Sequence, residues 1–336
     1  MGGKALKNTY TKRINRLEFD TISSEIINVI SKTFIHFDIP VFFKNKESFG
    51  DIDIIVSTTN INADIREYII NNFAPNEIFH NGNCWSFDYK ETQVDLIITD
   101  DKHFRSTLQY MGNSDLGNMV GRLAHALGLK YGQNGLCLNY RFKGSSIGEI
   151  IISEDYPKIL NFLGLSHKRF EEGFDELEDI FEFVAQSPYF NWKKFQLVEL
   201  NKINRDRNKK RASYLSLLAW IDKNVADENH EFEFVDDKSI YFELINKTFP
   251  EANMVRQIRG LEYLECKKLY IQAKFNGGDI MRTYGLEGKK LGDKINGFKA
   301  YISLNRTFDE YIIQTDMTEI YQDFETYLKN SVYEKD

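Results

Sequence analysis

The run Gly50-Asp51-Ile52-Asp53-Ile54-Ile55-Val56 constrains the fold of this chain more than any other segment. It follows a glycine and is rich in Ile and Val, which predicts a strand entered through a turn. Because side chains alternate between the two faces of a strand, Asp51 and Asp53 share one face. Gly50 allows a tight entry into the strand and a close backbone approach by a phosphate. Carboxylates buried beside Ile and Val are costly without cations to compensate them.

A third carboxylate stands near the start of another predicted strand, in Val94-Asp95-Leu96-Ile97-Ile98. If that strand neighbours the first, three carboxylates converge. Their hard oxygen ligands suit two divalent cations, Mg²⁺ with Mn²⁺ as a substitute. Such a pair of ions stabilises both the attacking and the leaving oxygen of a phosphoryl displacement. Asp100 and Asp101 follow this strand and are expected to be loop residues rather than metal ligands.

Helical and strand periodicities alternate in the first half of the chain, which predicts a mixed α/β domain. Helices are expected over residues 17–35, 64–73 and 114–127, and strands over 51–56, 77–80, 84–89, 93–99 and 136–142. Beyond Asp155 the pattern is mostly helical. The sequence therefore predicts an α+β fold, with a junction near Ser187-Pro188 because proline disfavours helix in the residue before it.

The composition is that of a folded intracellular protein. The chain has 336 residues, of which 42% are hydrophobic and 28% charged, so about two domains are expected. The three cysteines lack metal-ligand spacing and fit a reducing compartment. No apolar run approaches the roughly 20 residues of a membrane span. We expect a cytoplasmic protein without a membrane partner.

The net charge of −7 does not favour a nucleic-acid binder, but the charge is unevenly spread. The segment from position 193 to position 211 contains eight Lys or Arg residues but only two acidic residues, Glu199 and Asp206. They form either a solvated helix face or a surface that contacts a phosphate backbone. The candidate nucleic-acid-binding residues are Lys193, Lys194, Lys202, Arg205, Arg207, Lys209, Lys210 and Arg211.

Several separated motifs resemble those of family X DNA polymerases, the DNA polymerase beta group, in the same order. The segment from Phe43 to Val56 resembles the palm motif, and Val94-Asp95-Leu96 is similar to the strand with the third carboxylate. Gln109-Tyr110-Met111-Gly112-Asn113 resembles the Tyr-Phe-Thr-Gly-Ser turn that borders the sugar of the incoming nucleotide. The resemblance covers roughly residues 38–192.

The resemblance implies a nucleotidyltransferase palm with a mixed β-sheet. Residues 1–37 would form a basic segment and a helix, residues 38–192 the palm with a thumb-like region, and residues 193–336 a mostly helical C-terminal domain that is a candidate for nucleic-acid binding. Asp51 and Asp53 would bridge both metal ions, and Asp95 would complete the catalytic one.

The resemblance also assigns the nucleotide-binding residues, which are Lys44 and Gly50 for the β- and γ-phosphates, Tyr110 for the sugar, and Asn118 and Arg122 for the nascent base pair. The chain departs from the family pattern at three points. Pro40-Val41 replaces a Gly-Ser that grips the triphosphate, and Gln109 replaces the first aromatic beside the sugar. Lys44 replaces an arginine and supplies charge without a bidentate fork.

A weaker resemblance concerns Asn276–Met281 and Gly285–Gly292, which are similar to part of the helical tail of tRNA CCA-adding enzymes and bacterial poly(A) polymerases. A helix-turn-helix corner that needs glycines explains the same residues.

The function expected from these resemblances is transfer of a nucleoside monophosphate from a nucleoside triphosphate to a DNA or RNA 3′ hydroxyl, most like a family X DNA polymerase. The alternatives are an RNA 3′-end enzyme, transfer to a protein or small molecule, and a non-catalytic nucleic-acid-binding protein.

Overall fold

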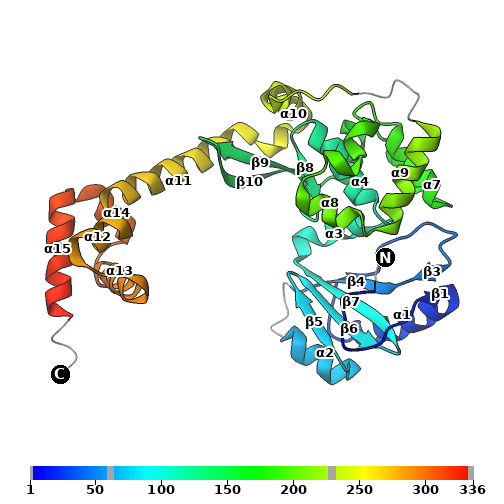
Figure 1. Cartoon of the computed structure of the whole chain (residues 1–336), viewed down its shortest axis with the longest axis horizontal. Coiled ribbons are helices and arrows are strands. Elements are labelled where there is room, and N and C mark those ends of the chain that lie inside the picture. Colours follow the sequence, from blue (N-terminus) through cyan, green and yellow to red (C-terminus); the bar gives the residue numbers. More distant parts are fainter. Residues whose placement is uncertain (1–2, 59–63, 226–231, 332–336) are drawn as a thin grey trace. The chain divides into compact units, whose positions relative to one another are not determined.

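The computed structural model describes residues 3–58, 64–225 and 232–331. The chain forms two compact units, one of residues 1–139 and 149–254 and one of residues 140–148 and 255–336. The first unit carries a mixed five-stranded sheet with helices, and a mostly helical region follows it (Figure 1). This confirms the α+β class. The segment boundaries expected after residues 37 and 192 stay predictions.

The central sheet of the first unit has the strand order β2-β4-β7-β6-β5. These strands are β2 (Phe37–Asp38), β4 (Asp51–Ser57), β5 (Ile78–Asn81), β6 (Cys84–Tyr89) and β7 (Thr92–Thr99). β4 and β7 run parallel, whereas all other neighbours in this sheet run antiparallel. β5 and β6 form the expected hairpin, with Gly82 at a φ of 61° in its turn.

The two faces of the sheet differ sharply in polarity. Ile52, Ile54 and Val56 of β4 are buried against helices α1 (Arg16–Ile30) and α2 (Ile65–Phe73) in one hydrophobic cluster. α1 and α2 lie on this face of the sheet in Figure 1. The alternation of side chains turns the aspartates of β4 to the other face, where α3 (Asp101–Met111) begins. One face of β4 thus packs in the apolar core, and its acidic side chains lie on the opposite face, outside that core.

The rest of the first unit is mainly helical. β1 (Ile14–Asn15) pairs with β3 (Ser48–Phe49). β8 (Lys130–Gly132), β9 (Gly135–Phe142) and β10 (Ser145–Ser153) form a three-stranded sheet, which belongs, apart from residues 140–148, to the first unit. Its remaining helices are α4 (Leu116–Ala126), α5 (Tyr156–Phe162), α6 (His167–Glu171), α7 (Leu177–Ala185), α8 (Lys202–Asn208), α9 (Ala212–Asn224) and α10 (Phe242–Thr248). Short 3₁₀ turns lie at Trp192–Phe195, Leu197–Glu199, Lys238–Tyr241 and Pro250–Ala252.

The second unit packs helices around an aromatic core. Its helices are α11 (Met254–Lys274), α12 (Gly277–Tyr284), α13 (Gly288–Ile302), α14 (Phe308–Gln314) and α15 (Met317–Asn330). Phe275, Phe298 and Phe324 are buried among Ile and Tyr side chains from these helices. The glycine-rich segment forms the corner between α12 and α13, where Gly285 has a φ of 64° and Gly288 a φ of 51°. The structure therefore has a corner between α12 and α13 at which two glycines adopt positive φ. No helix in the described part of the chain is long and apolar enough to cross a membrane.

Three local expectations were wrong. The first helix ends at Ile30 rather than at residue 35, because the chain turns to bury Phe34, whose amide donates to the Ile30 carbonyl. Asp101 is not a loop residue, since it opens α3, whereas Asp100 lies outside the helix and caps it by accepting the His103 N–H at 2.7 Å. The turn expected at residues 109–113 lies slightly later in the chain, because α3 continues to Met111.

Candidate functional site

Three carboxylates converge at one edge of the parallel strand pair. Asp51 and Asp53 lie on β4, and Asp53 stands level with Asp95 on β7 in the parallel register. All three side chains are half-buried. Ligand oxygens of the three, one from each, lie within 4.8 Å of one another. The neighbouring strands that the sequence hypothesis required are therefore present, and the spacing suits shared coordination of a cation.

The electrostatics of the cluster favour added positive charge. Burial, followed by the charges of Asp51 and Asp95, holds the pKa of Asp53 well above its usual range, and Lys46 opposes this. Burial and the Asp51 charge raise the pKa of Asp95 to about 6, although hydrogen bonds from Ser86 and Gln93 oppose the increase. Both shifts have the same direction, in which the surroundings favour the neutral forms of Asp53 and Asp95. A divalent cation among hard oxygen donors would supply the balance.

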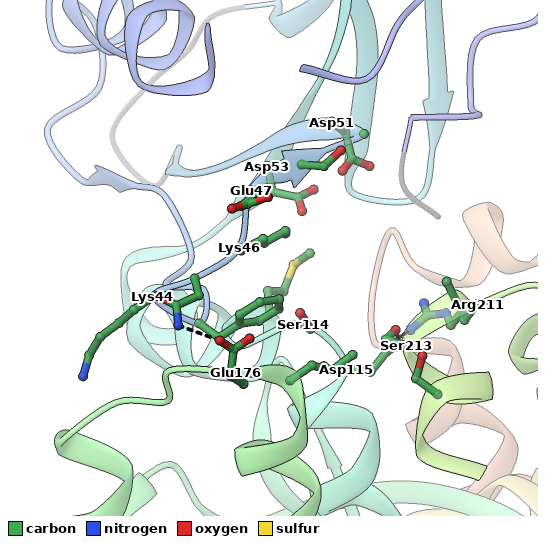
Figure 2. A pocket seen from close by; sticks show the side chains of 18 of the residues that line it. Lys44, Lys46, Glu47, Asp51, Asp53, Ser114, Asp115, Glu176, Arg211 and Ser213 are labelled. Atoms are coloured by element: carbon green, nitrogen blue, oxygen red, sulfur yellow. Dashed lines mark hydrogen bonds and ion pairs between the residues drawn. The ribbon is translucent and has the colours of Figure 1, made fainter. Parts of the chain in front are cut away.

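Lys46, which sequence reasoning missed, is the positively charged residue whose charge lowers the pKa of Asp53. Burial lowers the pKa of its ammonium group, whereas the charges of Asp51 and Asp53 raise it. The ammonium nitrogen also lies 4.7 Å from the centroid of the Phe49 ring. Figure 2 shows Lys46 beside Asp53 and Glu47 in the cleft. The only sequence signal was its place in the same short polar segment as Lys44.

Lys44 also lines the cleft, but its charge is used elsewhere. Its ammonium group pairs with Asp175 at 2.7 Å, and in Figure 2 its side chain extends away from the carboxylates. The backbone here is fixed, because the Lys44 N–H donates to the Phe174 carbonyl and the Asn45 N–H to the Asp175 carbonyl. Two hydrogen bonds thus tie the backbone of this loop to residues 174–175, and Lys46, rather than Lys44, interacts with the charges of the aspartates.

A cleft of about 1370 Å³ opens in front of the carboxylates. Asp51 and Asp53 lie on one wall with Gly50, and the starts of α4 and α9 form part of the opposite wall (Figure 2). Arg13 and Arg16 add positive charge to its lining. The cleft is larger than the roughly 300–1,000 Å³ of a typical small-molecule pocket, so it has room for a nucleotide and part of an acceptor.

The residues expected at the sugar and the base take different positions. Tyr110 lies in the last turn of α3, lines the cleft and is half-buried, with its ring 5.6 Å from that of Tyr131. Asn118 also lines the cleft, and its side-chain oxygen accepts a hydrogen bond from Arg207 at 3.0 Å. Arg122 is not among the cleft-lining residues of the described chain, and its guanidinium donates to the Lys194 carbonyl. Asn118 and Arg122 therefore do not face the same space.

The predicted nucleic-acid-binding cations are largely engaged within the protein. Lys194 pairs with Glu199 and Lys209 with Asp206, each at 2.6 Å. The guanidinium of Arg205 donates to the Leu200 carbonyl. The Lys193 ammonium lies 5.5 Å from the Trp192 ring centroid. Lys202 and Lys210 are exposed on α8 and just beyond it.

Arg211 differs from the other predicted cations because it turns into the cleft. Asp115 is buried, and its carboxylate accepts hydrogen bonds from the Arg211 guanidinium and the Ser213 hydroxyl. Figure 2 shows these three side chains together on the cleft wall across from Asp51 and Asp53. Sequence reasoning missed Asp115 and Ser213, since the pairing joins residues almost a hundred positions apart and no local pattern marks it.

No protein-family description matches the chain, and neither does any curated protein. The resemblance to family X polymerases therefore rests on the quoted motifs alone.

Proposed function

We propose that this protein is a metal-dependent nucleotidyltransferase whose first unit contains a palm like that of family X DNA polymerases. The observation that carries the proposal is the convergence of Asp51, Asp53 and Asp95 at the edge of a large cleft. A parallel strand pair that brings three carboxylates close together at one edge is a suitable base for phosphoryl-transfer chemistry.

The carboxylate cluster fits Mg²⁺ or Mn²⁺ by its donor chemistry. It offers only hard oxygen ligands, and burial leaves its negative charge under-compensated. Asp51 and Asp53 would hold both ions, and Asp95 would complete the site of one. When bound, the ions would stabilise negative charge on the attacking and leaving oxygens.

The other cleft residues bind and orient the nucleotide. Lys46, whose ammonium group feels the charges of Asp51 and Asp53, would hold the β- and γ-phosphates, a role that the resemblance assigned to Lys44. Gly50 lets these phosphates approach the backbone closely. Tyr110 bounds the sugar at the end of α3. One aspartate accepts the proton of the acceptor hydroxyl, which then attacks the α-phosphate while pyrophosphate leaves.

The acceptor we favour is a nucleic-acid 3′ hydroxyl, as the palm resemblance implies. A protein or small-molecule acceptor is the second candidate, and one observation favours it. Most of the basic residues expected to contact nucleic acid are already paired with protein groups. Cations that are engaged internally give little of the salt-dependent attraction typical of nucleic-acid binding.

The proposal is tested by incubating the protein with Mg²⁺, labelled DNA and RNA primers, and each dNTP and NTP separately. Asp53→Asn removes one metal ligand with little change in shape, and Asp222→Asn makes the same chemical change at an exposed position of α9. Primer extension that is lost only in Asp53→Asn supports the proposal, and the preferred primer distinguishes DNA from RNA roles. If no primer is extended, labelled nucleotide transferred to protein supports the second candidate. No metal-dependent transfer to any acceptor would refute both.

A further inference from the structure

The N-terminal strap, residues 3–9, lies along the strand ends that carry the acidic cluster. The Glu77 side chain fixes its far end by accepting the backbone N–H groups of Lys7, Asn8 and Thr9 at 3.0, 2.8 and 2.8 Å. Leu6 anchors its middle and is only 8% exposed. Three amides on one carboxylate together with a buried leucine give the strap a defined position.

The strap reaches two of the three carboxylates. The Gly3 N–H donates to Asp51 Oδ2 at 2.9 Å. The Ala5 N–H donates to Gln93 Oε1 at 2.8 Å, and Gln93 Nε2 in turn donates to Asp95 Oδ1 at 2.8 Å. Gln93 is 1% exposed, so its amide has no water to replace these partners. One short peptide therefore orients Asp51 directly and Asp95 through a buried side chain.

The contact at Asp51 depends on glycine. Gly3 has a φ of 78°, a conformation that other residues rarely adopt. A Cβ atom at this position would lie 1.9 Å from the Gly50 carbonyl oxygen. Any side chain at position 3 would move the strap away from Gly50 and Asp51.

The strap does not occupy the space where substrate would bind. The residues that line the cleft include Asp51 and Asp53, but within the described chain they include no residue of the strap. The strap thus approaches the carboxylates from outside the cleft, which argues against an autoinhibitory plug. At the acidic cluster, the Gly3 amide bonds Asp51 only at Oδ2, and the Gln93 amide bonds Asp95 at Oδ1.

We propose that the N-terminal strap is a positioning element of the metal site, in which the Gly3 amide orients Asp51 and Gln93 orients Asp95. The inference rests on the metal site of the proposed function. Hydrogen bonds to metal-ligating carboxylates fix the orientation of the ligand atoms, and their loss commonly weakens metal binding 10–100-fold, as an order of magnitude.

The test compares Gly3→Ala and Gln93→Met with Lys4→Ala, a change at an exposed strap residue. Gly3→Ala displaces the strap from Gly50 and Asp51. Gln93→Met keeps a side chain of similar length but removes the hydrogen bonds that link Ala5 to Asp95. Mn²⁺ affinity is measured by electron paramagnetic resonance titration of the free ion, and thermal unfolding in EDTA reports whether the fold is intact. We expect at least about tenfold weaker Mn²⁺ binding in Gly3→Ala and Gln93→Met, and wild-type affinity in Lys4→Ala.

A purely structural role would lower the unfolding temperature in EDTA without changing the Mn²⁺ affinity of the folded protein. A second readout is the Mg²⁺ concentration that gives half-maximal nucleotide transfer. It should rise by a similar factor, while the rate at saturating Mg²⁺ changes much less. Wild-type Mn²⁺ affinity in both Gly3→Ala and Gln93→Met would overturn the inference and leave the proposed function intact. Weaker Mn²⁺ binding in a protein that transfers no nucleotide would support the inference and refute the proposed function. A wild-type protein that binds no Mn²⁺ would refute both.

Discussion

Replacing Asp95 by Asn should stabilise the metal-free protein at neutral pH. The substitution keeps the shape and leaves an oxygen that accepts the Gln93 hydrogen bond, but it removes one of three crowded negative charges. Burial and the Asp51 charge raise the pKa of Asp95 from 3.8 to about 6. At about 1.4 kcal/mol per pKa unit, this shift corresponds to roughly 3 kcal/mol of lost stability whenever Asp95 must be ionised in the folded state.

The sign follows from proton binding. Between pH 4 and pH 6 the folded wild-type protein binds more protons at Asp95 than the unfolded chain does, so its stability falls as pH rises through this window. Below the unfolded pKa the cost vanishes, and above about pH 6 it is fully present. Asp95→Asn lacks this cost. The variant should therefore gain most at pH 7–8 and almost nothing near pH 4.

The assay is thermal or urea unfolding in EDTA across pH 4–8, with Asp222→Asn as the control for a charge lost at an exposed position. A gain of roughly 3 kcal/mol corresponds to a Tm increase of roughly 6–12 °C for a domain of this size. Saturating Mg²⁺ should reverse the order, because only the wild type keeps all three ligands. Equal stability of Asp95→Asn and wild type at pH 8 in EDTA would refute the reasoning that the carboxylate charges are uncompensated.

Two further predictions concern the cleft walls. Lys46→Met should raise the KM for the nucleoside triphosphate about tenfold or more in steady-state kinetics. The matched change Lys44→Met should have little effect on this KM, because the Lys44 ammonium group pairs with Asp175. A larger increase in KM for Lys44→Met than for Lys46→Met would instead support the assignment made from the sequence. Arg211→Ala should lower the free energy of unfolding by about 1–3 kcal/mol, since it leaves the buried Asp115 carboxylate with fewer hydrogen-bond partners. Urea unfolding at pH 7 measures this loss, with Lys210→Ala at an exposed neighbouring position as the control.

Local sequence predicted only those features of the candidate site that depend on a single strand, such as the face on which a side chain lies. The alternation of Asp51 and Asp53 with buried Ile52 and Ile54 follows from strand periodicity, and the structure has this alternation. The strand that carries Asp95 was recognised in the same way. α3 was missed because Asp100 and Asp101 favour loops and helix N-termini equally well.

The tertiary structure alone decided which groups surround the acidic cluster. It set β4 and β7 in a parallel register that brings Asp53 level with Asp95, and it turned Lys46 rather than Lys44 toward the aspartates. It also brought Gly3 to Asp51. These contacts join positions far apart in the chain, and periodicity reports only which face a side chain takes. The sequence by itself therefore determined the two strands that carry the aspartates, the face on which Asp51 and Asp53 lie and the α+β class. Long-range packing determined the partners of each carboxylate.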